Sequence, residues 1–154
     1  MSRAELRDEM SRVTFFGWVQ DGEIMAVAGL QPVANVTLIR HVYVLPEHQR
    51  RGLGTKLIHH LERLTRTRRL LVGAWSGAAW AINFYRKLGF ELLPNKNLLL
   101  DLYWQIPPRQ REVSVVLGLD MERRAHENRR AGPAGGLQRA HADPQEAGGA
   151  VCGG

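Results

Sequence analysis

The sequence has a single cysteine, comparatively few acidic residues and no long apolar run. Cys152, near the end of 154 residues, excludes a disulfide framework or a cysteine metal site. No stretch approaches the roughly 18 unbroken apolar residues of a membrane-spanning helix. The charged start MSRAELRDEM does not resemble a secretory signal. We therefore expect a cytoplasmic protein with no metal site and no membrane partner.

Positive charge is what the sequence has in excess. It carries 21 Lys and Arg against 15 Asp and Glu, a net charge of +6. Seven of these basic residues lie between positions 49 and 70, where Glu62 is the only acid. This excess indicates an anionic partner, either nucleic acid or a small phosphorylated ligand, and charge alone does not choose between them.

The length and composition favour one ordered domain followed by a tail. A chain of 154 residues that is 44% hydrophobic can form one core. From Ala131 onward, 13 of 24 residues are Gly or Ala, with no periodic apolar face to offset the entropy of ordering. We predict a domain over residues 1–120 and an unstructured tail over 121–154.

The apolar pattern predicts alternating strands and helices. Asp21-Gly22 separates two apolar runs and suits a tight hairpin turn, and leucines after Gly52 recur on one helical face. The predicted elements are strands near 13–20, 24–31, 36–45, 69–75, 97–106 and 111–120, and helices over 53–66 and 78–88. This order predicts an α/β or α+β fold, with a mixed, mostly antiparallel sheet and flanking helices.

The segment HQRRGLGTKLIHHLE places glycines and arginines where a strand leads into a helix. Unpaired amides at a helix start attract phosphate, and Gly52 and Gly54 would let it approach the main chain. Arg50 and Arg51 would add charge. The alternative is a tight turn with solvated arginines. The glycine spacing fits neither a P-loop nor a dinucleotide-binding motif.

Two motifs together resemble a known family. VYVLPEHQRRGLGTKLI resembles the acetyl-CoA-binding motif of the GNAT superfamily of N-acetyltransferases, and WAINFYRKLGFEL resembles its second signature. The strand pattern extends the resemblance over about residues 13–120. It implies a GNAT-like acyl-CoA N-acyltransferase fold in which the third strand, often bulged, splays from the next and leaves a V-shaped cleft.

The resemblance also implies where acetyl-CoA would bind. The pantetheine arm would lie against the backbone of Val42, Tyr43 and Val44. The pyrophosphate would rest on the loop and helix start, which comprise Gln49, Arg50, Arg51, Gly52, Leu53, Gly54 and Thr55.

Catalytic roles follow for two residues. Tyr85 matches the tyrosine that protonates the departing thiolate, although it could simply pack at a helix surface. His41 is the one titratable candidate for the general base on its strand. It could instead only cover the sheet, and a water relayed through Glu23 or a backbone carbonyl is equally open.

The sequence departs from the family pattern at two places. Ala78 stands where many members carry an asparagine that contacts the CoA arm, and Asn83 is out of register with that place. Only about ten residues precede the first hairpin, where the superfamily has a strand and one or two helices. We expect Met1 to lie inside a longer ancestral domain, and we predict that the exposed edge of the first strand causes a homodimer or poor solubility.

The function that these features imply is acetyl transfer. We expect an N-acetyltransferase that moves an acetyl group from acetyl-CoA to a primary amine by direct attack in a ternary complex, without a metal. One alternative is a non-catalytic, degenerate CoA-binding module. A less favoured one is a basic nucleic-acid-binding protein, since no stacking platform or DNA-binding motif accompanies the charge.

Overall fold

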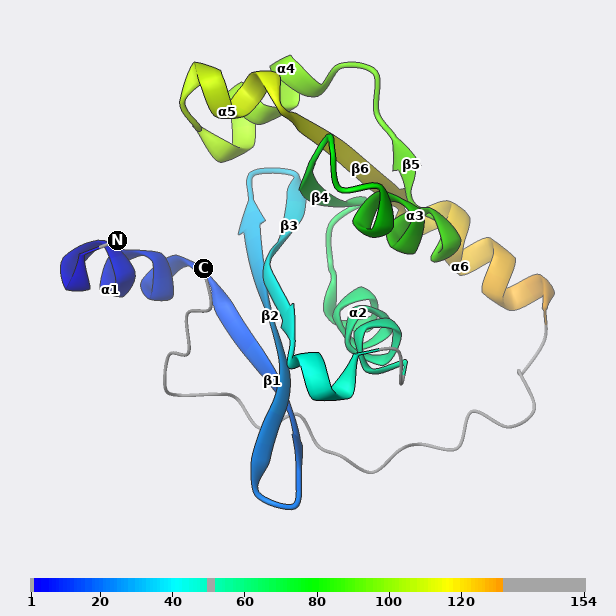
Figure 1. The fold of residues 1–154 in the computed structure, drawn as a ribbon. Helices are drawn as coiled ribbons and strands as arrows, with labels where there is room; N and C mark the ends of the chain where they lie inside the picture. Colours follow the sequence, from blue (N-terminus) through cyan, green and yellow to red (C-terminus); the bar gives the residue numbers. More distant parts are fainter. Residues whose placement is uncertain (1, 50–51, 132–154) are drawn as a thin grey trace.

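A six-stranded sheet forms the centre of the structure, a computed structural model that describes residues 2–49 and 52–131 (Figure 1). The strands are β1 (Thr14–Gln20), β2 (Glu23–Val33), β3 (Val36–Val44), β4 (Arg69–Trp75), β5 (Glu91–Leu92) and β6 (Ser114–Asp120). They follow the order β1-β2-β3-β4-β6-β5. The β3–β4 pair is parallel and the other pairs of this sheet are antiparallel. The predicted mixed, mostly antiparallel sheet is confirmed.

The first hairpin forms where the sequence predicts it. Asp21 and Gly22 both have positive φ, 52° and 78°, as a two-residue turn between right-twisted strands requires. Gln20 pairs with Glu23 across this turn, and the pairing continues to Thr14 and Leu30.

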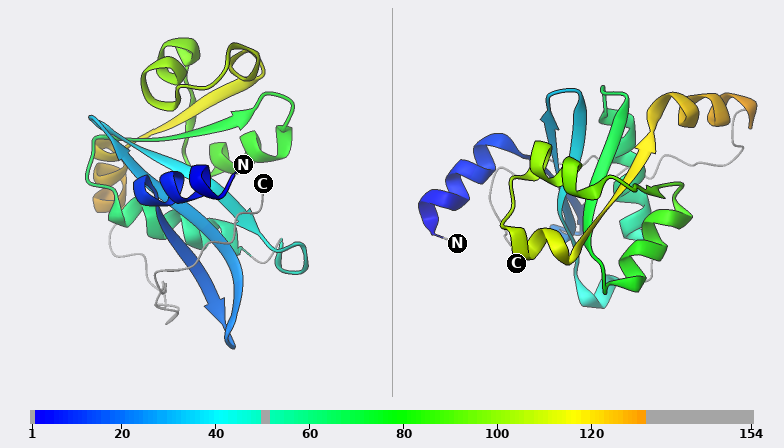
Figure 2. Two further views of the ribbon diagram at one scale, coloured as in Figure 1. Left: turned by 90° about the vertical axis from the view of Figure 1, so that its left-hand side faces the viewer. Right: turned by 90° about the horizontal axis from the view of Figure 1, so that it is seen from above.

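Helices cover both sides of the sheet. Helices α2 (Leu53–Leu64) and α3 (Ala79–Lys87) lie on one side, and α1 (Arg3–Arg12) lies on the other (Figures 1 and 2). The leucine pattern has its expected effect, because Leu57 and Leu61 are buried against the sheet whereas Leu64, at the helix end, is 39% exposed. Tyr85 of α3 belongs to the same core cluster.

The predicted strand over 97–106 is wrong. This segment forms α4 (Lys96–Leu99) and a π-helical turn, η2 (Leu100–Trp104), and α5 (Pro108–Glu112) follows. An apolar run without strict alternation fits a buried helical turn as well as a strand. Leu99 and Leu100 pack into a second cluster on the sheet face opposite α2, so burial there determines the outcome.

The predicted unstructured tail is wrong for its first ten residues, which form α6 (Met121–Arg130). Asp120 caps this helix, because its carboxylate accepts hydrogen bonds from the amides of Glu122 and Arg123 at 3.0 and 3.1 Å. Arg124 also reaches Glu62 of α2, with 3.5 Å between Nε and Oε2. The rest of the predicted tail, residues 132–154, lies outside the described residues.

The residues before the first hairpin form α1. Its first turn has a reciprocal cap: the amide of Glu5 donates to the Ser2 hydroxyl at 3.1 Å, and the amide of Ser2 donates to the Glu5 carboxylate at 2.6 Å. The helix packs near β1, the edge strand of the sheet. This short segment therefore supplies a single helix beside the hairpin.

Candidate active site

The centre of the site is a split between β3 and β4. The two parallel strands pair from Val36 to Ile39 with Arg69 to Val72, and not beyond. In the same region the β2–β3 register shifts between Val27 and Gly29, and His41 adopts a φ of 56°. A bulge of this kind bends the strand that carries it. The expected bulge and the expected divergence of the two strands are therefore present in the fold.

The start of α2 lies directly after the end of β3 and the short loop that follows it. Gly52 is the N-cap and has a left-handed conformation, with φ 76° and ψ 10°. Among the residues that the structure describes, no side chain caps this end, and the first amide to bond back to Gly52 is that of Lys56. The first amides of a helix lack partners within it, so those of Leu53, Gly54 and Thr55 can receive an anion. Arg50 and Arg51 lie outside the described residues.

Gly54 brings the three parts of the expected cofactor site together. A Cβ built there would lie 3.3 Å from the ring of Phe84 in α3 and 3.8 Å from a methyl of Val44 in β3. Glycine therefore lets the loop, the strand and α3 approach closely. On the loop, the side-chain amide of Gln49 donates to the carbonyl oxygen of Val44 at 3.1 Å, which holds the loop against the end of β3.

Tyr85 lies in α3, on the face of the sheet that α2 also covers. Its side chain is only 6% exposed. Its ring makes edge contacts with Phe84 and Phe90, at centroid distances of 5.1 and 5.4 Å. Burial raises the pKa of Tyr85, so the phenol keeps its proton at neutral pH. Among the described residues, none hydrogen-bonds its hydroxyl.

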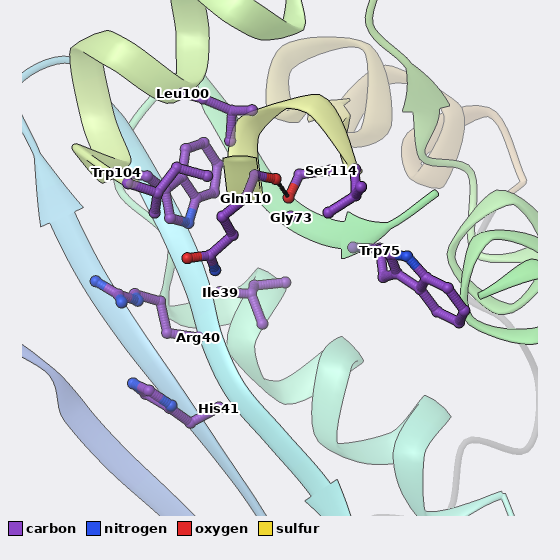
Figure 3. A pocket seen from close by; sticks show the side chains of 12 residues that line it. Ile39, Arg40, His41, Gly73, Trp75, Leu100, Trp104, Gln110 and Ser114 are labelled. Atoms are coloured by element: carbon purple, nitrogen blue, oxygen red, sulfur yellow. Dashed lines mark hydrogen bonds between the residues drawn. The ribbon is translucent and has the colours of Figure 1, made fainter. Parts of the chain in front are cut away.

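A pocket of about 410 Å³ opens on the opposite face. It is lined by the last part of β3 (Ile39, Arg40, His41), the end of β4 (Gly73, Ala74, Trp75) and the segment from η2 to the start of β6 (Leu100, Trp104, Ile106, Gln110, Val113, Ser114). In Figure 3 the side chain of Gln110 points from α5 toward β3. The pocket therefore adjoins the split from the side away from α2 and α3.

The sequence did not predict this wall, because residues 97–106 were expected to form a strand. One signal for it was present: Gly73 interrupts an apolar strand, and such a glycine often marks a close approach. A Cβ at Gly73 would lie 3.7 Å from the indole of Trp104. The absence of a side chain there lets Trp104 lie against β4.

The two base candidates occupy different places. His41 lines the pocket, and its ring lies 5.7 Å from that of Phe15. Glu23 is at the tip of the first hairpin, exposed and paired with Gln20, and it does not line the pocket. Of the two side chains, only His41 is placed beside the split.

Alanine occupies the family's asparagine position at the start of α3. Ala78 is the N-cap of α3 and is 7% exposed, with no side-chain cap. Asn83 lies on an exposed part of the helix. The side-chain contact that an asparagine would provide is therefore missing.

Neither a metal cluster nor a membrane span is found in the part of the chain that the structure describes. No three His, Cys, Asp or Glu side chains among residues 2–49 and 52–131 are grouped so that they could hold an ion. Within the same ranges, every helix is too short or too polar to cross a bilayer.

Comparisons with known proteins agree with this geometry. The sequence model of the acetyltransferase (GNAT) family matches residues 2–90, more than half of the chain. No curated protein matches the sequence.

Solved structures share the fold. The ribosomal-protein-S18-alanine N-acetyltransferase from Escherichia coli superposes with a TM-score of 0.60 at 25% identity, over 79% of this chain and 77% of that one. A GNAT family acetyltransferase from Elizabethkingia anophelis with acetyl-CoA bound gives 0.60 at 18% identity, over 77% and 83%. A Bacillus subtilis acetyltransferase in complex with CoA gives 0.58 at 21%, over 77% and 84%. The chain belongs to the GNAT acetyltransferase family and is an acetyl-CoA-dependent acyltransferase.

Proposed function

We propose that the protein is an N-acetyltransferase that transfers the acetyl group of acetyl-CoA directly to a primary amine. The observation that carries this proposal is the split between β3 and β4. It has the uncapped start of α2 at one end and a pocket on the opposite face. Two ligands that enter from opposite faces can meet at such a split, as direct transfer in a ternary complex requires.

The donor would be held mainly by backbone groups. Tyr43 and Val44 pair with β2 along one edge of β3, while the other edge pairs with β4 only as far as Ile39. That edge, from Val42 to Val44, is available to the amides of a pantetheine arm. The amides from Gly52 to Thr55, with Gln49 beside them, would receive the pyrophosphate. Arg50 and Arg51 are assigned to the pyrophosphate from the sequence alone.

The chemistry needs one base and one acid on opposite sides of the split. His41 would take a proton from the incoming ammonium, so that the neutral amine attacks the thioester carbonyl. A backbone amide would stabilise the oxyanion. As the carbon–sulfur bond breaks, Tyr85 would donate its proton to the thiolate. As the intermediate collapses, its nitrogen loses its second proton to solvent, so the products are an amide and free CoA, and the phenolate regains a proton from solvent.

A degenerate module that binds CoA without turnover is the rival function, and Ala78 in place of the asparagine is what favours it. Calorimetric titration with acetyl-CoA, followed by CoA release with a panel of amines, separates the two. We expect micromolar binding by the wild type and loss of binding in Gly54→Val, whose side chain would overlap Phe84. Binding without turnover on any amine would establish the rival. Absence of binding by folded wild type would refute both.

We also propose that two copies associate through β1. This strand forms an edge of the sheet and pairs with β2 on its other side. An unpaired edge offers backbone donors and acceptors to another strand. The aromatic side chains of β1 are partly covered by α2: the ring of Phe16 lies 5.7 Å from that of His60, and the Lys56 ammonium lies 5.7 Å from the Trp18 ring. The backbone edge, and not the aromatic side chains, would therefore make the contact.

A further inference from the structure

We propose that Trp80 of α3 stacks on the adenine base of acetyl-CoA. This inference deepens the proposed function and rests on it. The pantetheine and pyrophosphate sites leave the base of the donor without a binding surface, and the indole of Trp80 would provide one. Trp80 would be a positioning residue for the donor and would take no part in the chemistry.

Trp80 lies near the start of α3 with its indole in solvent. It is 79% exposed, the largest value for any large hydrophobic side chain in the described part of the chain. At 3.6 residues per turn, the buried residues Ala78 and Tyr85 lie on the other side of the helix. Single exposed apolar residues are common, but an indole offers a large flat surface whose burial by a ligand is favourable. The side chain is therefore available to an aromatic ligand.

Phe84 shows where this part of α3 lies. A Cβ built at Gly54 would be 3.3 Å from the ring of Phe84, so α3 contacts the first turn of α2 at that residue. Helices α2 and α3 lie on the same side of the sheet (Figure 1). Trp80 precedes Phe84 by four residues, so the two side chains are neighbours on the helix surface, about 6 Å apart along the axis. Trp80 is therefore about one helical turn from the contact with the proposed pyrophosphate site.

The exposure of three side chains on α3 follows the path that the donor would take. Tyr85, the proposed acid at the sulfur, is 6% exposed, Phe84 beside the start of α2 is partly buried, and Trp80 is 79% exposed. In acetyl-CoA the thioester, the pyrophosphate and the adenosine follow in this order. A donor with its thioester at Tyr85 and its pyrophosphate at the start of α2 would therefore reach solvent beside Trp80. A base can stack there on the indole while its polar edge stays in water.

Calorimetry with two donors isolates the contact with the base. Acetyl-CoA carries a 3′-phosphoadenosine group, whereas S-acetyl-4′-phosphopantetheine ends at a phosphate and has no base. We expect Trp80→Ala to weaken acetyl-CoA binding about tenfold, as loss of base stacking does, and to leave binding of the shorter donor unchanged. Trp80→Phe should keep most of the affinity, because phenylalanine retains a stacking face but has no indole N–H. The control is Leu98→Ala, which also removes an exposed apolar side chain, 57% exposed on α4, and should keep full affinity.

Each outcome decides the assignment. Unchanged acetyl-CoA affinity in Trp80→Ala, or an equal loss for both donors, would overturn it while leaving the acetyl-CoA site and the N-acetyltransferase function intact. An affinity of Trp80→Phe as low as that of Trp80→Ala would assign the contact to the indole N–H, and would also overturn stacking. A general defect in folding would weaken both donors, so the comparison still decides if a variant is less stable. Absence of acetyl-CoA binding by folded wild type would refute the proposed function, and this inference with it.

Discussion

Replacing Gly52 with alanine gives a test of the donor site in which the strain can be matched by a control. Gly52 has φ 76°, and a Cβ at this position would meet no atom of the described residues within 4 Å. The substitution therefore adds no clash with them and perturbs the backbone conformation. Gly22, at the tip of the first hairpin, has φ 78° and the same open surroundings. The two substitutions impose the same strain, one at the proposed pyrophosphate site and one at the far end of the hairpin.

The magnitude follows from the backbone. An L-residue in the left-handed region costs about 1–2 kcal/mol. Part of this cost is offset because alanine restricts the unfolded chain by about 0.4–1 kcal/mol. We expect both variants to lose about 1 kcal/mol of unfolding free energy. If the chain at position 52 relaxes to escape the strain, the amides at the start of α2 move. Binding acetyl-CoA must then restore the strained conformation, which costs up to the same amount, or about fivefold in affinity.

The assays are urea unfolding for stability and calorimetry for acetyl-CoA affinity. We expect Gly22→Ala to lose stability without losing affinity, whereas Gly52→Ala loses both. If Gly52→Ala is less destabilised than Gly22→Ala, so that its backbone has relaxed, and it still binds acetyl-CoA as tightly as the wild type, then the start of α2 is not where the pyrophosphate lies, and the assignment of this loop is wrong.

Four further predictions concern catalysis, packing, pH dependence and assembly. Tyr85→Phe should lower kcat by roughly 10²-fold or more with an unchanged acetyl-CoA affinity, as expected for loss of a general acid; an undiminished kcat would assign the proton to another donor. Arg124→Ala should destabilise the protein by about 2 kcal/mol in urea unfolding, because Glu62 is 10% exposed and its Oε1 has no partner among the described residues. Replacing Arg123, which is exposed, should lower the unfolding free energy far less. Burial also raises the pKa of Glu62 above its ordinary value of 4.5, so the stability of wild type relative to Glu62→Gln should fall as the pH rises through that raised pKa; an increase would contradict this assignment. If β1 edges pair, light scattering should show a dimer that a Trp18→Pro variant loses, and a wild-type monomer at high concentration would rule the dimer out.

The sequence predicted the parts of the fold that are governed by local chemistry. Asp21-Gly22 can supply two consecutive positive φ values, so the first hairpin was predictable. The leucines at 53, 57 and 61 leave one buried face for α2, and its boundaries agree with the structure within two residues. The motif at the start of this helix was visible because glycine is needed there for a stated backbone reason, a φ of 76° at Gly52.

The prediction failed where a local pattern allowed two structures and tertiary burial chose between them. The short apolar run in NLLLDLYWQI fits a strand or a buried helix, although its polar residues Asn97, Asp101 and Gln105 recur every four positions, and packing of Leu99 and Leu100 onto the sheet face selected the helix. For α6, the prediction of an unstructured tail began at residue 121, although the Gly- and Ala-rich composition begins only at Ala131. The prediction therefore missed the helix cap at Asp120 and the ion pair between Arg124 and Glu62.

The two wrong predictions differ in their consequences for the predicted site. Misplacing α6 left the site unchanged, because its capping and ion pairs lie beside α2 and β5, away from the split. Because residues 97–106 were expected to form a strand, the sequence did not predict the pocket wall that they form. It also did not predict the position of Trp104, whose indole covers Gly73. The proposed donor site is visible in the sequence because it is one continuous stretch, in which backbone amides and glycines follow each other in order. The proposed acceptor pocket joins β3, β4 and a segment about sixty residues later, and no periodicity in one segment records which distant segment will cover it. In this fold, the proposed donor site is therefore encoded by one local stretch of sequence. The proposed acceptor pocket, which would determine specificity, depends on tertiary packing.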